Sequence, residues 1–142
     1  MMKGLTYLGC LVLVFGCGHK NEAFKSGTFQ IIENDSIVGE LYRFGNYQIE
    51  KYPGRELIAR IEYKTDSSCL MHGIEKDPMG IDTIVWLNKF KETSKGNFLI
   101  NATPYNVNVD YMYEGMLLKI DEGIDERNLN RLDSLNESLK FK

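Results

Sequence analysis

Two stretches of the chain alternate between apolar and polar residues. In residues 57–64 the side chains at 57, 59, 61 and 63 are apolar, and those at 60, 62 and 64 are charged. In residues 105–111 the odd positions are apolar and the even positions polar. A period of two places successive side chains on opposite faces of a strand. Each stretch therefore predicts a strand with one buried and one solvated face, as in an antiparallel sheet.

Turn residues recur at short intervals along the chain. Each predicted turn contains Gly, Pro or Asn, which suit the backbone angles of tight turns. These turns lie at residues 33–35, 44–46, 53–55, 77–80, 94–97 and 114–115. Short strands joined in this way predict a mainly β protein. We expect an antiparallel up-and-down meander of about eight strands, curved into a small or partly open lipocalin-like barrel.

The C-terminal segment has a different period. Leucines at 129, 132, 135 and 139, together with Ile124, fall within an arc of roughly 140° on a helical wheel. This predicts an amphipathic α-helix over about residues 124–140, with Asp121 or Asp125 as the candidate N-cap. We expect the helix to pack on the sheet or to plug an open end of it, and a partner-binding helix is the alternative.

The N-terminus has the order of a secretory signal. Lys3 precedes an apolar run of 11 residues, from Leu5 to Phe15, and Gly16 and Cys17 follow. A membrane-spanning helix needs about 20 apolar residues, so the run better fits a signal peptide. A buried N-terminal strand is the alternative.

The four residues 14–17, Val-Phe-Gly-Cys, resemble the lipobox of bacterial lipoproteins. The resemblance implies a signal peptide over residues 1–16, cleavage before Cys17, and acyl chains such as palmitate on the Cys17 thiol. Gly18 after the cysteine resembles the pattern for outer-membrane sorting. We therefore expect a protein anchored by lipid in the cell envelope, with an anchor and tether over residues 17–26 and one β-domain over residues 27–142.

Cysteine and histidine usage disfavours several chemistries. With Cys10 lost and Cys17 lipidated, Cys69 has no partner for an intramolecular disulfide. Within a strand, Cys69 and His72 are separated by an odd number and point to opposite faces, which predicts an inert buried thiol rather than a Cys–His couple. His19 and His72 alone do not supply the ligands of a zinc site, and the acidic pairs at 121–122 and 125–126 lack calcium-loop spacing.

No nucleotide or nucleophile-elbow motif is present, so we expect no cofactor, no metal and no enzyme. Carboxylates brought together from neighbouring strands remain an open alternative. Residues 1–16 hold one lysine and no acid, which leaves a net charge of −4 without them. A weakly acidic chain without a basic cluster disfavours nucleic-acid binding.

Aromatic residues are the candidate ligand contacts. Core filling is the default role of Tyr63, Trp86 and Tyr111, and the alternative is that they line a cup-like opening. Three hypotheses about function remain. They are a protein-binding module at the envelope, a lipocalin-like carrier of a small apolar ligand, and a periplasmic hydrolase inhibitor that uses the loop at residues 76–80.

Short motifs resemble a group of small uncharacterised lipoproteins from Bacteroidetes. They are residues 24–29 (Phe-Lys-Ser-Gly-Thr-Phe), 47–50 (Tyr-Gln-Ile-Glu) and 61–64 (Ile-Glu-Tyr-Lys), the last shortly before Cys69. The resemblance spans about residues 24–120 and implies a β-meander or lipocalin-like fold, with no activity or functional residue.

Three tripeptides resemble the O-glycosylation acceptor pattern of exported Bacteroidetes proteins. They lie at residues 35–37, 82–84 and 133–135. Ser134 is the favoured acceptor because it would project from the polar side of the helix. Ordinary turn and cap residues are the alternative interpretation of the tripeptides.

Overall fold

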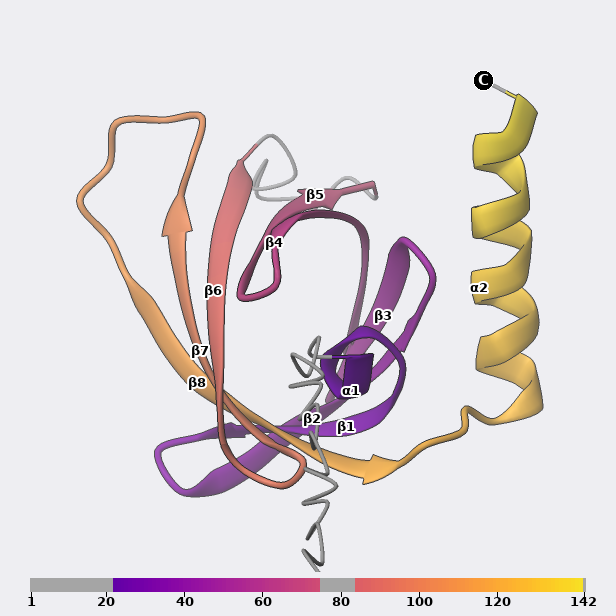
Figure 1. Ribbon diagram of the computed structural model, residues 1–142, viewed down its shortest axis with the longest axis horizontal. Helices are drawn as coiled ribbons and strands as arrows, with labels where there is room; N and C mark the ends of the chain where they lie inside the picture. The colour runs from indigo at the N-terminus through magenta and orange to yellow at the C-terminus, as the bar shows by residue number, and fades with distance from the viewer. Residues whose placement is uncertain (1–21, 75–83, 142) are drawn as a thin grey trace, which may run out of the picture.

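A strand of alternating polarity needs a hydrogen-bonded neighbour along each edge and burial of its apolar face. A closed barrel provides both. In the computed structural model, which describes residues 22–74 and 84–141, eight antiparallel strands form a closed barrel (Figure 1). Each strand pairs with its neighbours in the chain, and β1 pairs with β8. The strands are β1 (Gly27–Glu33), β2 (Ser36–Phe44), β3 (Tyr47–Tyr52), β4 (Arg55–Thr65), β5 (Ser68–Gly73), β6 (Val85–Ser94), β7 (Asn97–Pro104) and β8 (Tyr113–Asp121). The predicted meander and barrel are confirmed, and the sheet closes.

The alternation in β4 has the predicted effect. Ile61 is buried in the barrel core, and Ala59 and Tyr63 pack against that core from the same face. Glu62 lies on the opposite face, where its carboxylate contacts Lys64 and His72. The hairpin turn at Asn34 and Asp35 has φ of 48° and 60°, as a two-residue type I′ turn requires.

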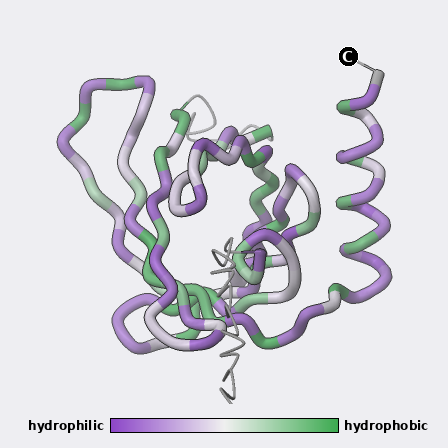
Figure 2. The backbone as a smooth tube through the Cα atoms, viewed as in Figure 1, coloured by the Kyte–Doolittle hydropathy of each residue, from purple (hydrophilic) through white to green (hydrophobic). Residues whose placement is uncertain are grey.

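Two predicted elements are wrong. Residues 105–111 form no strand but belong to the loop between β7 and β8, around which hydrophobic and hydrophilic residues alternate (Figure 2). Pairing with β6 ends there, since Tyr105 donates its N–H to the Val85 carbonyl at 2.7 Å and Asn106 accepts from the Val85 N–H at 2.8 Å. Residues 114–115 form no turn and lie within β8.

One end of the barrel is plugged by the short helix α1 (Glu22–Lys25). The Phe24 ring stacks on Phe90 with centroids 3.6 Å apart and meets the edge of Phe98 at 5.3 Å. Residues 22–25 are therefore part of the folded domain. This corrects the prediction that the tether extends to residue 26, because Phe24 is a core side chain despite its polar neighbours.

The C-terminal helix α2 (Glu126–Ser138) packs on the outside of the barrel and is followed by a 3-10 helix, η2 (Leu139–Phe141). Asp125 is the N-cap, and its carboxylate accepts the Asn128 N–H at 3.0 Å. Leu132 is fully buried against Tyr42, Ile49 and neighbouring side chains of β2–β4. The helix thus covers the outer face of the sheet, and the plug is α1.

Candidate ligand-binding cavity

The barrel is hollow at the end opposite α1. The cavity has a volume of about 640 Å³ and opens between Glu33 at the end of β1, Pro53 in the β3–β4 turn and Tyr111 in the β7–β8 loop. At its inner end it meets Phe24 of the plug. The barrel therefore has a closed end and an open mouth.

The hollow arises because small residues occupy inward-facing positions in the open half. Ala59 of β4 and Gly73 of β5 are register partners, and both line the cavity. Ala102 of β7 and Gly115 of β8 also line it. Toward the closed end larger side chains fill the interior, among them Phe29, Phe90 and Phe98. Side-chain volume, rather than the backbone, thus determines where the barrel is empty.

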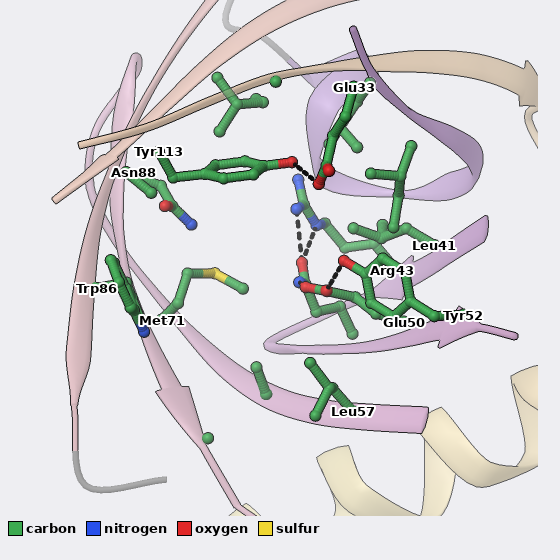
Figure 3. A pocket seen from close by; sticks show the side chains of 18 of the residues that line it. Glu33, Leu41, Arg43, Glu50, Tyr52, Leu57, Met71, Trp86, Asn88 and Tyr113 are labelled. Carbon is green, nitrogen blue, oxygen red and sulfur yellow. Dashed lines mark hydrogen bonds between the residues drawn. The ribbon is translucent and has the colours of Figure 1, made fainter. Parts of the chain in front are cut away.

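One side of the cavity is apolar. Met71 and Trp86 are register partners on β5 and β6, and their side chains lie together in the wall (Figure 3). The Tyr111 ring meets the edge of Trp86 with centroids 5.9 Å apart. Ile100 and Leu117 continue the apolar surface. This wall suits an aliphatic or aromatic body.

The other side carries a chain of hydrogen bonds across β2 and β3. Arg43 donates from Nε and Nη2 to the Gln48 side-chain oxygen, at 3.0 and 2.6 Å. The Gln48 amide in turn donates to Glu50, and the Tyr52 hydroxyl donates to the same carboxylate at 2.7 Å. Burial and the neighbouring Glu50 carboxylate raise the pKa of Tyr52 far above its ordinary value. Tyr52 is therefore held as a protonated hydrogen-bond donor.

Arg43 is buried beneath this chain, with 2% of its surface exposed. Its Nη1 donates to the Phe24 carbonyl at 2.8 Å, and the guanidinium lies 4.1 Å from the centroid of the Phe24 ring. A buried charge is costly unless it is hydrogen-bonded and paired. Gln48 connects the Arg43 charge to Glu50. The same chain of hydrogen bonds therefore also joins α1, which plugs the barrel, to the inner end of the cavity.

A second polar pair lies across β1 and β8. The Tyr113 hydroxyl donates to Glu33 Oε1 at 2.6 Å. Burial, followed by this hydrogen bond, raises the pKa of Tyr113 well above its ordinary value. In Figure 3 the Glu33–Tyr113 pair and the Glu50–Tyr52 pair point toward the same space. Two carboxylates therefore face one cavity.

Asn88 of β6 adds an amide to the wall near Tyr113 (Figure 3). Within the described part of the chain, the Asn88 side chain makes no hydrogen bond. An amide carries two donors and an acceptor, so Asn88 offers hydrogen bonds to a molecule in the cavity.

The three aromatic residues predicted to contact a ligand separate in space. Trp86 and Tyr111 line the cavity, Trp86 in its wall and Tyr111 at its mouth. Tyr63 does not line it, and packs against the core with its hydroxyl buried and lacking a hydrogen-bond partner among the described residues. Sequence reasoning missed the polar lining: Glu33, Arg43, Gln48, Glu50, Tyr52, Asn88 and Tyr113. One signal for these residues was available in the sequence. Arg43 and Glu50 stand an even number of positions from inward-facing residues of their own strands, so they share the inner face.

The structure describes only some of the other predicted sites. Cys17 and the loop at residues 76–80 are outside the described residues. Ser134 is exposed on α2, and its hydroxyl donates to the Asn130 carbonyl at 2.9 Å. Cys69 is fully buried inside the barrel, whereas His72 contacts Glu62 on the outer face at 3.3 Å. The predicted separation of thiol and imidazole is therefore confirmed.

Within residues 22–74 and 84–141, no group of three or more His, Cys, Asp or Glu side chains is placed to hold a metal ion. In the same ranges, no helix has the length and apolar character needed to span a bilayer. Comparison with known proteins finds no match among protein-family models, curated proteins or solved structures.

Proposed function

We propose that this protein is a carrier that holds one small, mainly apolar molecule in its barrel. The observation that carries the proposal is the open cavity of about 640 Å³, with an apolar wall and a few polar groups. Ligand sites typically occupy about 300–1,000 Å³ and combine these two features. Exposed apolar side chains near the mouth, including Val109, Tyr111 and Met112, favour the passage of such a molecule.

The single tryptophan of the chain supplies the test, because Trp86 lies in the cavity wall. Titration with dodecanol should shift the Trp86 fluorescence in a saturable manner. Ala102→Phe places a ring inside the cavity and should abolish the response. Leu99 lies on the same strand with an exposed side chain, so the Leu99→Phe variant should bind dodecanol as the wild type does. Equal binding by both variants would contradict the proposal.

We also propose that the carrier is anchored by lipid on Cys17 in the cell envelope, most simply at the outer membrane. The described chain begins in α1 at the closed end, and the five residue-to-residue steps from Cys17 to Glu22 reach at most about 18 Å. Such an anchor would leave the mouth directed away from the membrane. Cys17→Ser should release the protein from membranes into the soluble fraction, and continued membrane association would contradict the anchor.

A protein-binding module is the second candidate. It is favoured by the β7–β8 loop, in which Tyr105, Val107 and Val109 lie outside the strands and expose apolar side chains. Replacement of Tyr105 and Val109 by serine should then abolish capture of a specific envelope protein while dodecanol binding persists. Unchanged capture would remove this candidate. The hydrolase-inhibitor hypothesis depends on residues 76–80, outside the described residues.

A further inference from the structure

We infer that the ligand is a cationic amphiphile, with an aliphatic body on the Trp86 wall and a protonated amine held by Glu33 and Glu50. The inference rests on the proposed carrier function and specifies the chemistry of its ligand. It follows from two observations. The first is which polar atoms of the cavity are accessible to a ligand, and the second is which of their hydrogen atoms already form hydrogen bonds within the protein.

The accessible charges inside the cavity are negative. Glu33 and Glu50 are partly exposed to the cavity space, whereas the positive charge of Arg43 is covered. The Phe24 ring lies over the guanidinium, and three of its N–H groups already donate to Gln48 and to the Phe24 carbonyl. Arg55 also lines the cavity but is exposed at the mouth and already has an interaction. Inside the mouth, an anionic head group would therefore lie against two carboxylates and a covered guanidinium.

The hydrogen-bonding pattern favours a donor. Tyr52 and Tyr113 each commit their hydroxyl hydrogen to a carboxylate, so their oxygens remain as acceptors. Each carboxylate has lone pairs beyond the bonds that it already accepts. Beside the Asn88 amide, which offers both donors and an acceptor, the shared space thus presents four acceptor groups, and a protonated amine brings three donors and no acceptor. A carboxylate ligand would bring acceptors only.

Electrostatics agree with this pattern. Two carboxylates that face one cavity repel each other, and the buried Arg43 compensates only through the Gln48 amide. A cation between Glu33 and Glu50 would supply the missing charge. The apolar body would then extend along Met71 and Trp86, on the opposite side of the cavity (Figure 3).

The test compares three ligands that share one aliphatic chain and differ in the head group. Dodecylamine, dodecanol and dodecanoate are titrated, below their aggregation concentrations, into the full chain at neutral pH, with Trp86 fluorescence as the readout. We expect dodecylamine to bind at least about tenfold more tightly than dodecanoate, with dodecanol between them. This comparison uses the wild-type protein and requires no variant.

Variants then locate the head group. Glu33→Gln should weaken dodecylamine binding by about tenfold and leave dodecanol binding nearly unchanged. Glu114→Gln, at an exposed position next to Tyr113, should leave both unchanged. Dodecanoate binding as tight as that of dodecylamine, or equal effects of Glu33→Gln and Glu114→Gln, would overturn the inference and leave the carrier function intact. Failure of all three ligands to bind would overturn the carrier function together with the inference.

Discussion

The phenol ring of Tyr113 lies across Gly115, two residues further along β8. A Cβ atom at position 115 would come within 2.5 Å of the Tyr113 hydroxyl oxygen. That hydroxyl donates to Glu33 of β1 at 2.6 Å. Gly115 therefore provides the space in which Tyr113 reaches across the cavity, and a glycine that resembles a turn signal in the sequence serves to position a site residue.

Gly115→Ala should displace Tyr113 and break its bond to Glu33. We expect the free energy of unfolding in urea to fall by about 1–3 kcal/mol, the usual cost of an overpacked interior. Dodecylamine affinity should fall as well. Gly123→Ala is the control, because a Cβ there meets Asp121 at 3.4 Å, an ordinary contact. A Gly115→Ala variant as stable as Gly123→Ala would show that Tyr113 is not constrained in this way.

Leu132→Ala should detach or loosen α2 from the barrel. Leu132 is fully buried, and removal of a buried leucine side chain costs about 2–5 kcal/mol in unfolding free energy. Leu139→Ala, at a position 36% exposed, should cost far less. Urea unfolding followed by circular dichroism provides the measurement. Dodecanol binding should persist in both variants because α2 lies outside the barrel, and its loss in Leu132→Ala alone would contradict this independence.

The cap of α2 should make stability depend on pH. Hydrogen bonds from the Asn128 side chain and backbone lower the pKa of Asp125 below 3.8. A lowered folded-state pKa contributes stability above the ordinary value, and this stability is lost as the pH falls through the lowered value. Asp125→Ala should therefore cost about 0.5–2 kcal/mol at pH 7, with a smaller difference from wild type below about pH 4.

Asp125→Asn is the matched variant, since it keeps an oxygen acceptor for the Asn128 N–H but does not titrate. Its difference from Asp125→Ala should stay constant from pH 7 to about pH 3. Urea unfolding of the three proteins across this range checks both expectations. A wild-type advantage over Asp125→Ala that is constant down to about pH 3 would contradict the role of the Asp125 charge.

Cys69 should be unreactive in the folded protein. Its thiol is fully buried, and burial raises the pKa of the Cys69 thiol, so little reactive thiolate forms. Iodoacetamide should leave Cys69 unmodified in buffer and alkylate it in urea, as measured by peptide-resolved mass spectrometry. Alkylation at equal rates in the two conditions would mean that the barrel opens readily on the timescale of the reaction.

The sequence predicted the barrel because a period of two is a local property. Any strand with one buried face shows it, and eight such strands with tight turns leave few other architectures. The same pattern misled at residues 105–111, where alternation continues past the last pairing with Val85. A period of two indicates that a segment is able to form a strand, but a neighbouring strand must supply the hydrogen bonds.

The candidate site was less accessible to sequence reasoning. Trp86 could be selected because a lone tryptophan in an apolar run is conspicuous. Glu33 could not, and Arg43 was marked only by its position in phase with inward-facing residues, since a charged residue in a strand normally faces solvent. They face inward because Gln48 and Tyr113, from neighbouring strands, provide their hydrogen-bond partners.

The sequence by itself determined the class of fold and the C-terminal helix, because each depends on periods within one segment, and it indicated the burial of Cys69 through the residue type. Tertiary structure alone decided that Phe24 plugs one end, that Ala59 and Gly73 leave the other end hollow, and that two carboxylates face one space. These features depend on which side chains meet across strands distant in the chain. Strand register and barrel closure determine these side-chain contacts, and no single segment of the sequence encodes them.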